Sequence, residues 1–171
     1  KHRGLNENLA RELLELHTLG AAGPYTQQDV RELAKLLTGL SADNFRDAQF
    51  RPNIAEPGAE TVLGRSYGGA RPARADIERM LEDLAVHPAT ARHLARKLAV
   101  HFVADTPDAG LVEAIAQAYM KSDGDLSAAY GAMLDHPAAW RDFGAKAKRP
   151  VDFLISAMRA LDLPEGDLSG L

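Results

Sequence analysis

The chain has no cysteine among its 171 residues. That absence excludes disulfide bonds, thiol catalysis and zinc sites built on thiolate ligands. Aromatic residues are scarce, at 6%, whereas hydrophobic residues reach 46% and are mostly alanine and leucine. A chain of this length has room for one compact core, and small aliphatic side chains favour closely packed helices over sheets.

The chain also lacks a strong excess of either charge and any long apolar run. Its net charge is -4 and its isoelectric point is near 5.9, which argues against a general nucleic-acid-binding protein. No apolar run approaches the roughly 18 residues needed to span a bilayer. The chain opens with Lys1, His2 and Arg3 and has no apolar leader, so any signal peptide would lie upstream. We therefore expect no nucleic-acid partner and no membrane span within this chain.

The hydrophobic periodicity predicts an all-α fold, a compact bundle of about seven helices forming one domain over residues 1–171. Start and stop signals place helices over residues 4–20, 26–39, 73–86, 88–103, from 107, from 126 and from 150. One irregular or short β-hairpin excursion is expected near residues 45–67, built from residues 50–54 and 61–67 on either side of Pro57 and Gly58. Residues 162–171 are expected to form a fraying tail.

Apolar residues at helical spacing identify the faces expected to be buried. In the first helix these are Leu5, Leu9, Leu13 and Leu16. In the later helices the residues expected inward are Val30, Leu33, Ala34, Leu37, Ile77, Met80, Leu81, Leu84, Ala91, Leu94, Ala95, Leu98, Phe102, Leu111, Ile115, Ala118, Tyr119, Leu126, Tyr130, Met133, Leu134, Val151, Leu154, Ile155, Met158 and Leu161.

The first helix also carries a polar stripe, formed by Asn8, Arg11, Glu12 and Glu15 at i, i+3, i+4 and i+7. His17 lies about 140° round the helix from Glu12, so this helix alone cannot bring them onto one metal ion. The chain contains no Glu-x-x-His sequence of the kind that di-metal carboxylate bundles use. We expect no metal and no cofactor.

The polar stripe has two interpretations. One is an ion-pair face, supported by the i,i+4 pairs that Arg11 makes with Glu7 and Glu15. Because the fourth helix carries a basic flank, we also predict that Glu12 or Glu15 bonds to Arg96 or Lys97. The other interpretation is a binding face, whose candidate residues are Asn8, Arg11, Glu12, Glu15, His17, Arg96 and Lys97.

Two further motifs have simpler interpretations than a ligand site. The loop Ser122-Asp123-Gly124-Asp125 lacks the later ligands of a calcium loop, and Asp125 is expected to cap the next helix. A His-Pro-Ala sequence occurs twice, at residues 87–89 and 136–138, where each histidine is expected near a helix C-terminus. The basic cluster at residues 146–149 is either an anion contact or a solvated linker.

The run from Asn6 to Gly20, followed by residues 25–30, resembles the signature of the domain of unknown function 1800 family. The resemblance continues through residues 87–91, 97–99, 122–126 and 146–151. It implies a large, exported, mostly helical bacterial protein with no established activity, of which this chain would be the C-terminal part. Members usually carry a His-Asp pair and a later Lys where this chain has Ala55, Glu56 and Glu60, so sites that depend on those residues are in doubt here.

Two functions remain open. The first is an interaction or scaffold module that binds the missing N-terminal half, a partner protein or a second copy, in the periplasm or outside the cell as the resemblance implies. The alternative is part of an enzyme with hydrolase-like acid and base chemistry, shared with the missing half, in which Glu12 or Glu15 is the general base. No Gly-x-Ser-x-Gly, His-Glu-x-x-His or phosphate-binding glycine loop is present to favour the enzyme.

Overall fold

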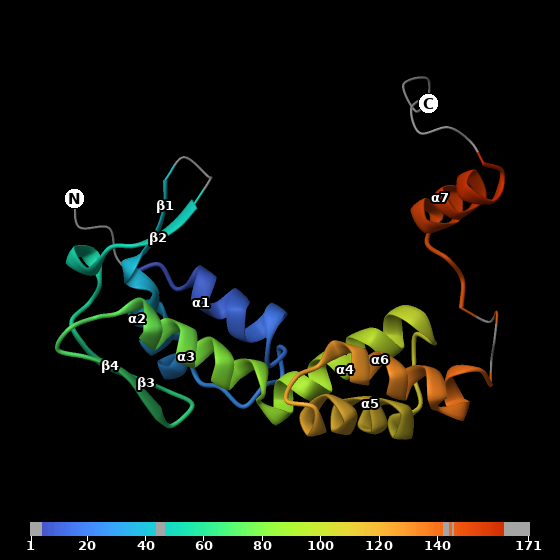
Figure 1. The fold of residues 1–171 in the computed structure, drawn as a ribbon, viewed down its shortest axis with the longest axis horizontal. Helices are drawn as coiled ribbons and strands as arrows, with labels where there is room; N and C mark the ends of the chain where they lie inside the picture. Colours follow the sequence, from blue (N-terminus) through green and yellow to red (C-terminus); the bar gives the residue numbers. More distant parts are fainter. Residues whose placement is uncertain (1–4, 44–46, 142–143, 145, 163–171) are drawn as a thin grey trace.

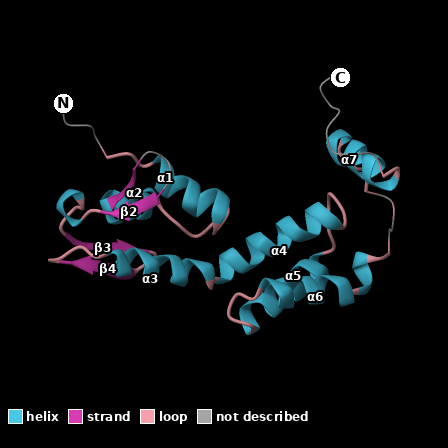
Figure 2. Ribbon diagram, turned by 45° about the horizontal axis from the view of Figure 1, so that its top comes forward, coloured by secondary structure: helices cyan, strands magenta, loops and turns pink. Residues whose placement is uncertain are grey.

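The computed structural model describes residues 5–43, 47–141, 144 and 146–162. Gly4, part of the predicted excursion and the predicted tail from residue 163 lie outside the described residues. Over these residues the fold is mainly helical, with seven α-helices and two small two-stranded antiparallel sheets. Figures 1 and 2 show how these elements are arranged. The prediction of an all-α protein with about seven helices is confirmed, and a single domain stays a prediction. No described helix is long and apolar enough to cross a membrane.

The elements follow one another in a simple order along the chain. The helices are α1 (Asn8–Glu12), α2 (Gln27–Leu36), α3 (Arg74–Ala85), α4 (Pro88–Phe102), α5 (Ala109–Lys121), α6 (Leu126–Asp135) and α7 (Pro150–Ala160). One hairpin pairs β1 (Leu40–Asp43) with β2 (Asp47–Phe50), and the other pairs β3 (Gly58–Val62) with β4 (Arg65–Gly69). A π-helical turn, Leu13–His17, continues α1, and short 3-10 turns occupy Leu37–Gly39, Pro52–Ile54 and Pro137–Ala139.

The buried side chains form two separate hydrophobic clusters. The first joins α1, α2, α3 and the β3–β4 hairpin, and its members are Ala10, Leu14, Leu19, Val30, Leu33, Ala34, Leu36, Leu37, Val62, Tyr67, Ile77, Met80 and Leu84. The second joins α4, α5, α6 and the Pro137–Ala139 turn, through Ala91, Ala95, Ala99, Leu111, Ile115, Ala116, Tyr119, Ala129, Met133 and Ala138. Figure 1 shows the two groups of helices lying end to end.

A few contacts join the two clusters. The Tyr119 hydroxyl donates to the carbonyl oxygen of Ala85 over 3.0 Å, and His93 Nε2 lies 3.3 Å from the carbonyl oxygen of Leu16. Gly20 permits the second contact: its φ is +87°, and a Cβ there would lie 2.8 Å from His93 Nδ1. Only glycine adopts this backbone conformation without strain and also leaves room for the imidazole ring.

The α2 N-terminus forms as the sequence predicts. Thr26 Oγ1 accepts from the Asp29 amide and Asp29 Oδ2 accepts from the Thr26 amide, which completes a capping box. Asp29 Oδ1 also accepts from the Leu63 amide over 2.7 Å, which ties the helix to the turn between β3 and β4. Burial would raise the pKa of Asp29, but hydrogen bonds from Thr26 and Leu63 outweigh it and lower the pKa below its usual value.

The excursion contains two hairpins, whereas the sequence predicts one. Leu63 and Gly64 both have positive φ, at 51° and 77°, and form a tight two-residue turn inside the segment expected to be one strand. Residues 52–54 form a 3-10 turn and not the expected strand, because Pro52 has no amide proton for a strand ladder.

Several side chains expected to be buried are exposed. In α1 the buried face is Ala10 and Leu14, and the expected face is exposed at Leu5, Leu9 and Leu16. The π-helical turn at Leu13–His17 adds a residue per turn, which rotates Leu16 away from the position expected at about 100° per residue. Leu5 and Leu9 precede this turn and are exposed because the first helix packs through Ala10 and Leu14 instead. The other residues found exposed are Leu81, Phe102, Leu126, Tyr130, Leu134, Val151, Leu154, Ile155 and Leu161.

Candidate interaction surface

The polar face of α1 joins this helix to α2 through Glu7. Glu7 accepts from Gln27 Nε2 over 2.6 Å, and its carboxylate lies 3.2 Å from Arg31 Nε. Arg11 donates to Gln27 Oε1 over 2.7 Å and pairs with Glu7 at 3.5 Å, which confirms one of the two predicted i,i+4 pairs. The other predicted pair, Arg11 with Glu15, does not form among the described residues. Arg11 is therefore held within a contact between two helices.

No local pattern in the sequence indicates that Glu7 is the centre of this contact. Its partners Gln27 and Arg31 lie 20 and 24 positions further along the chain. Only the antiparallel packing of α1 against α2 brings them together. Periodicity within α1 could not show this packing register.

The other members of the predicted binding face remain dispersed. Asn8, Glu12, His17, Arg96 and Lys97 are exposed and Glu15 is half-buried. Within the part of the chain that the structure describes, no ion pair joins Glu12 or Glu15 to Arg96 or Lys97, so the predicted pairing is wrong. The reason is that α4 meets the first helix through His93 at the Leu16 carbonyl, one turn before Arg96. A binding role for these residues stays a prediction.

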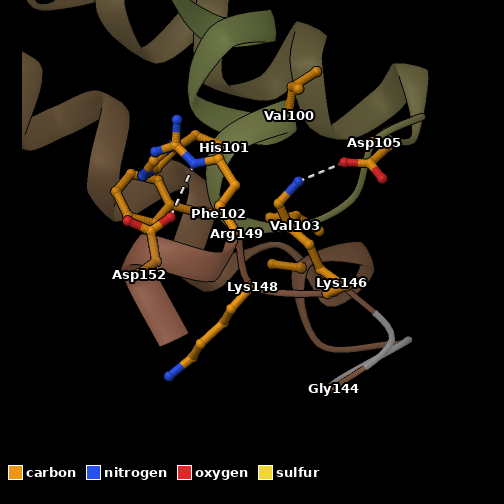
Figure 3. A pocket seen from close by; sticks show the side chains of 12 residues that line it. Val100, His101, Phe102, Val103, Asp105, Gly144, Lys146, Lys148, Arg149 and Asp152 are labelled. Carbon is orange, nitrogen blue, oxygen red and sulfur yellow. Dashed lines mark hydrogen bonds and ion pairs between the residues drawn. The ribbon is translucent and has the colours of Figure 1, made fainter. Parts of the chain in front are cut away.

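A cavity of about 670 Å³ lies where the end of α4 meets the segment leading into α7 (Figure 3). Lys146 Nζ lies 2.6 Å from Asp105 Oδ1, and Arg149 Nε lies 2.9 Å from Asp152 Oδ2. Figure 3 shows Lys148 extending away from both ion pairs. Two cations of the predicted basic cluster are therefore paired: Lys146 joins the segment before α7 to the end of α4, and Arg149 pairs with Asp152 within the first turn of α7.

The described part of the chain shows no group of three or more histidine, aspartate or glutamate side chains placed to hold a metal ion. The loop at Asp123 and Asp125 acts as the sequence predicts, because Asp125 Oδ1 caps α6 by accepting from the Ser127 amide over 2.8 Å.

The helix α7 carries the clearest unsatisfied surface. It has no buried residue, although it has an apolar stripe at helical spacing. The exposed fractions are 64% for Val151, 57% for Leu154, 49% for Ile155 and 70% for Leu161. Figures 1 and 2 agree that α7 lies apart from the two groups of packed helices. We call Val151, Leu154, Ile155 and Leu161 the α7 stripe.

A second exposed apolar line runs along α6. Leu126, Tyr130 and Leu134 follow one another at intervals of four residues and are 47%, 40% and 52% exposed. Trp140, beyond the next turn, is 53% exposed, and its Nε1 donates to the carbonyl oxygen of Leu134 over 2.7 Å. We call these four residues the α6 stripe.

Apart from Trp140, the residues of both stripes are predicted from the sequence as apolar faces, but the prediction assigns these faces to the core. Periodicity shows that a helix has an apolar face, and it does not show whether the same chain covers that face. The position of Phe153 in the sequence already indicates that α7 is not apolar on one face alone, because helical spacing places it on the opposite side from the stripe. In the structure Phe153 is 62% exposed. A helix with apolar residues on both sides and few aromatic neighbours in the chain is a candidate for contact with another surface.

Comparison with known proteins supports a family assignment and no more. No curated protein and no solved structure matches this chain. A family model described as "Protein of unknown function (DUF1800)" matches residues 1–169, almost the whole sequence. The chain therefore belongs to the DUF1800 family.

Proposed function

We propose that this chain is a protein-interaction module and that the α7 stripe is its docking surface. The observation that carries the proposal is the complete lack of buried residues in an eleven-residue amphipathic helix. A helix this short is marginal in water by itself, and most helical stability in proteins comes from packing an apolar face. An uncovered stripe on such a helix is best explained by a surface that covers it during function.

The site favours interaction over acid and base catalysis. A general acid or base works in a pocket that shifts its protonation equilibrium. Glu12 is exposed and Glu15 is half-buried, and neither lines the cavity at the end of α4. The proposed docking surface, in contrast, brings together on one side three apolar side chains of α7 and that of its C-cap residue, Leu161.

Site-specific photo-crosslinking in the bacterial host tests the proposal. A photoreactive phenylalanine analogue at Ile155 samples the stripe, and the same analogue at Phe153 samples the opposite side of α7. We expect discrete protein adducts from position 155 and few from position 153, with the adduct identified by mass spectrometry. Equal labelling at both positions, or no protein adduct from position 155, would contradict the proposal.

A further inference from the structure

We propose that the surface that covers the α7 stripe is the α6 stripe of a second copy of this chain, with the exchange made in both directions. This inference rests on the proposed function and names its partner. It requires three conditions. The helix α7 must not reach α6 of its own chain, the segments that carry the two stripes must have opposite net charges, and the combined area of the stripes must be large enough for a dimer interface.

The start of α7 is held away from α6 of the same chain. The Lys146 ammonium pairs with Asp105 at 2.6 Å, which fixes the segment before α7 beside the end of α4. Phe102 at the end of α4 and Asp152 in the first turn of α7 line the same cavity. From this anchor α7 projects outward, and Figures 1 and 2 show it apart from α6.

The segments that carry the two stripes differ in the sign of their net charge. Residues 121–141, which contain α6, carry three aspartates against Lys121 and Arg141, and Arg141 already lies 3.8 Å from Asp108. Residues 148–162, which contain α7, carry Lys148, Arg149 and Arg159 against two aspartates, and Arg149 already pairs with Asp152. Complementary charges of this kind steer association and select orientation more than they add affinity.

The exposed area favours a reciprocal exchange over a single contact. The two aromatic residues each present roughly 150–250 Å² when fully exposed, and the six aliphatic residues present less, so the exposed fractions of the eight stripe residues give at most about 800 Å² for one contact. Stable specific interfaces bury about 1,200–2,000 Å² in total. One contact falls short, whereas two symmetric contacts give up to about 1,600 Å² and generate a closed twofold dimer.

Sedimentation equilibrium on the 171-residue chain tests the inference. We expect the wild-type mass to rise with concentration to twice the 18.5 kDa of one chain. Leu154→Asp on α7 and Leu134→Asp on α6 should each raise the dimer dissociation constant at least about 100-fold, because each buries a charge in an apolar contact. Phe153→Asp, on the far side of α7, is the matched control and should change it less than about threefold.

Mixing the two defective variants distinguishes a reciprocal exchange from other arrangements. The α7 of the Leu134→Asp chain and the α6 of the Leu154→Asp chain are both intact, so the mixture should associate more tightly than either variant alone. All three variants should keep the wild-type circular dichroism spectrum, because each changed side chain is more than half exposed.

Three results would overturn the inference: a wild-type chain that stays monomeric up to millimolar concentration, a dimer insensitive to Leu154→Asp, or a mixture no tighter than its components. A result that rules out the second copy can be distinguished from a result that rules out the proposed docking role of α7. A monomeric chain whose Ile155 crosslinks a different protein would remove the second copy and leave the docking role of α7 intact.

Discussion

At the scale of single residues, Glu60 is a carboxyl group in an unfavourable environment. It lies on β3, is only 4% exposed, and fits because Gly68 leaves room where a Cβ would lie 2.9 Å from Glu60 Oε2. Burial raises the pKa of Glu60 and the nearby charges of Glu32 and Glu56 raise it further, whereas a hydrogen bond from its own backbone amide and the charge of Lys35 only partly offset them. The sequence marked this position as a departure from its family without showing that it would be buried.

We predict that Glu60→Gln stabilises the folded protein at neutral pH, by about 1 kcal/mol. A carboxyl whose pKa is raised in the folded state binds its proton more tightly there, so stability falls as the pH rises from the usual glutamate range through the folded pKa. The glutamine variant does not titrate, and its advantage should therefore appear across that same window. Urea unfolding at pH 4 and pH 7 measures it.

Glu82→Gln is the matched control, because Glu82 is an exposed carboxylate on α3. It should change the unfolding free energy by less than about 0.5 kcal/mol at both pH values. A Glu60→Gln protein that is less stable than wild type at pH 7 would show that the carboxylate is satisfied and not strained.

Asp29 has the opposite pH dependence. Its pKa is lowered in the folded protein, so the stability it contributes is present above the usual aspartate pKa and is lost as the pH falls through the folded value. We predict that Asp29→Asn costs about 1–2 kcal/mol at pH 7, because one amide oxygen cannot replace both carboxylate acceptors. The difference from wild type should shrink toward zero near pH 2, as measured by urea unfolding; a constant difference would contradict this.

At the scale of elements, the two His-Pro-Ala corners share one geometry. Nδ1 of His87 accepts from the Ala89 amide over 3.1 Å, and Nδ1 of His136 accepts from the Ala138 amide over 3.2 Å. The sequence predicts each histidine near the end of the preceding helix, and this is confirmed: His136 is the C-cap residue of α6, and His87 directly follows the C-cap residue of α3. Each histidine also caps the element that follows, because the proline fixes the first helical residue and leaves the next amide without a partner.

We predict that His87→Ala lowers the unfolding free energy by about 1 kcal/mol or more through loss of this cap. His87→Asn should recover most of the loss, since asparagine supplies a side-chain oxygen that caps well. Thermal unfolding of the three proteins gives the comparison. Equal melting temperatures for the alanine and asparagine variants would show that ring packing, not the cap, is responsible.

The sequence predicted where helices begin better than it predicted which helix faces are buried. Thr26 with Asp29, Asp125 and Pro150 are local signals, and each marks a helix start in the structure. The turn at Leu63 and Gly64 was missed because a leucine with positive φ is unusual, and here a distant carboxylate, Asp29, supports it. The exposed faces of α1, α6 and α7 depend on which helices meet, and no spacing within one helix determines that.

The candidate site was the least predictable part. The residues proposed from α1 and α4 are identifiable by charge, but the pairing of Glu12 or Glu15 with Arg96 required a packing arrangement that the chain does not adopt. The actual charge contact centres on Glu7 and joins α1 to α2. The α7 stripe was predicted correctly as a pattern and wrongly as part of the core.

At the scale of the whole molecule, two hydrophobic clusters lie end to end and α7 extends from the second. The first cluster gains rigidity from the Asp29 and Glu7 contacts, whereas one ion pair among the described residues, Lys146 with Asp105, joins the segment before α7 to the end of α4. An exposed ion pair sets a position but contributes little to stability. Contact of the α7 stripe with a second copy should therefore supply most of the stability of this helix.

The reactivity of a single introduced thiol tests this account most directly, and the absence of native cysteine makes the label unique. Ile155→Cys lies in the α7 stripe and Phe153→Cys lies opposite it. At concentrations where the dimer forms, we predict that a water-soluble thiol reagent modifies position 155 at least about tenfold more slowly than position 153, and that dilution removes the difference. Equal rates for the two thiols at every concentration would contradict the account.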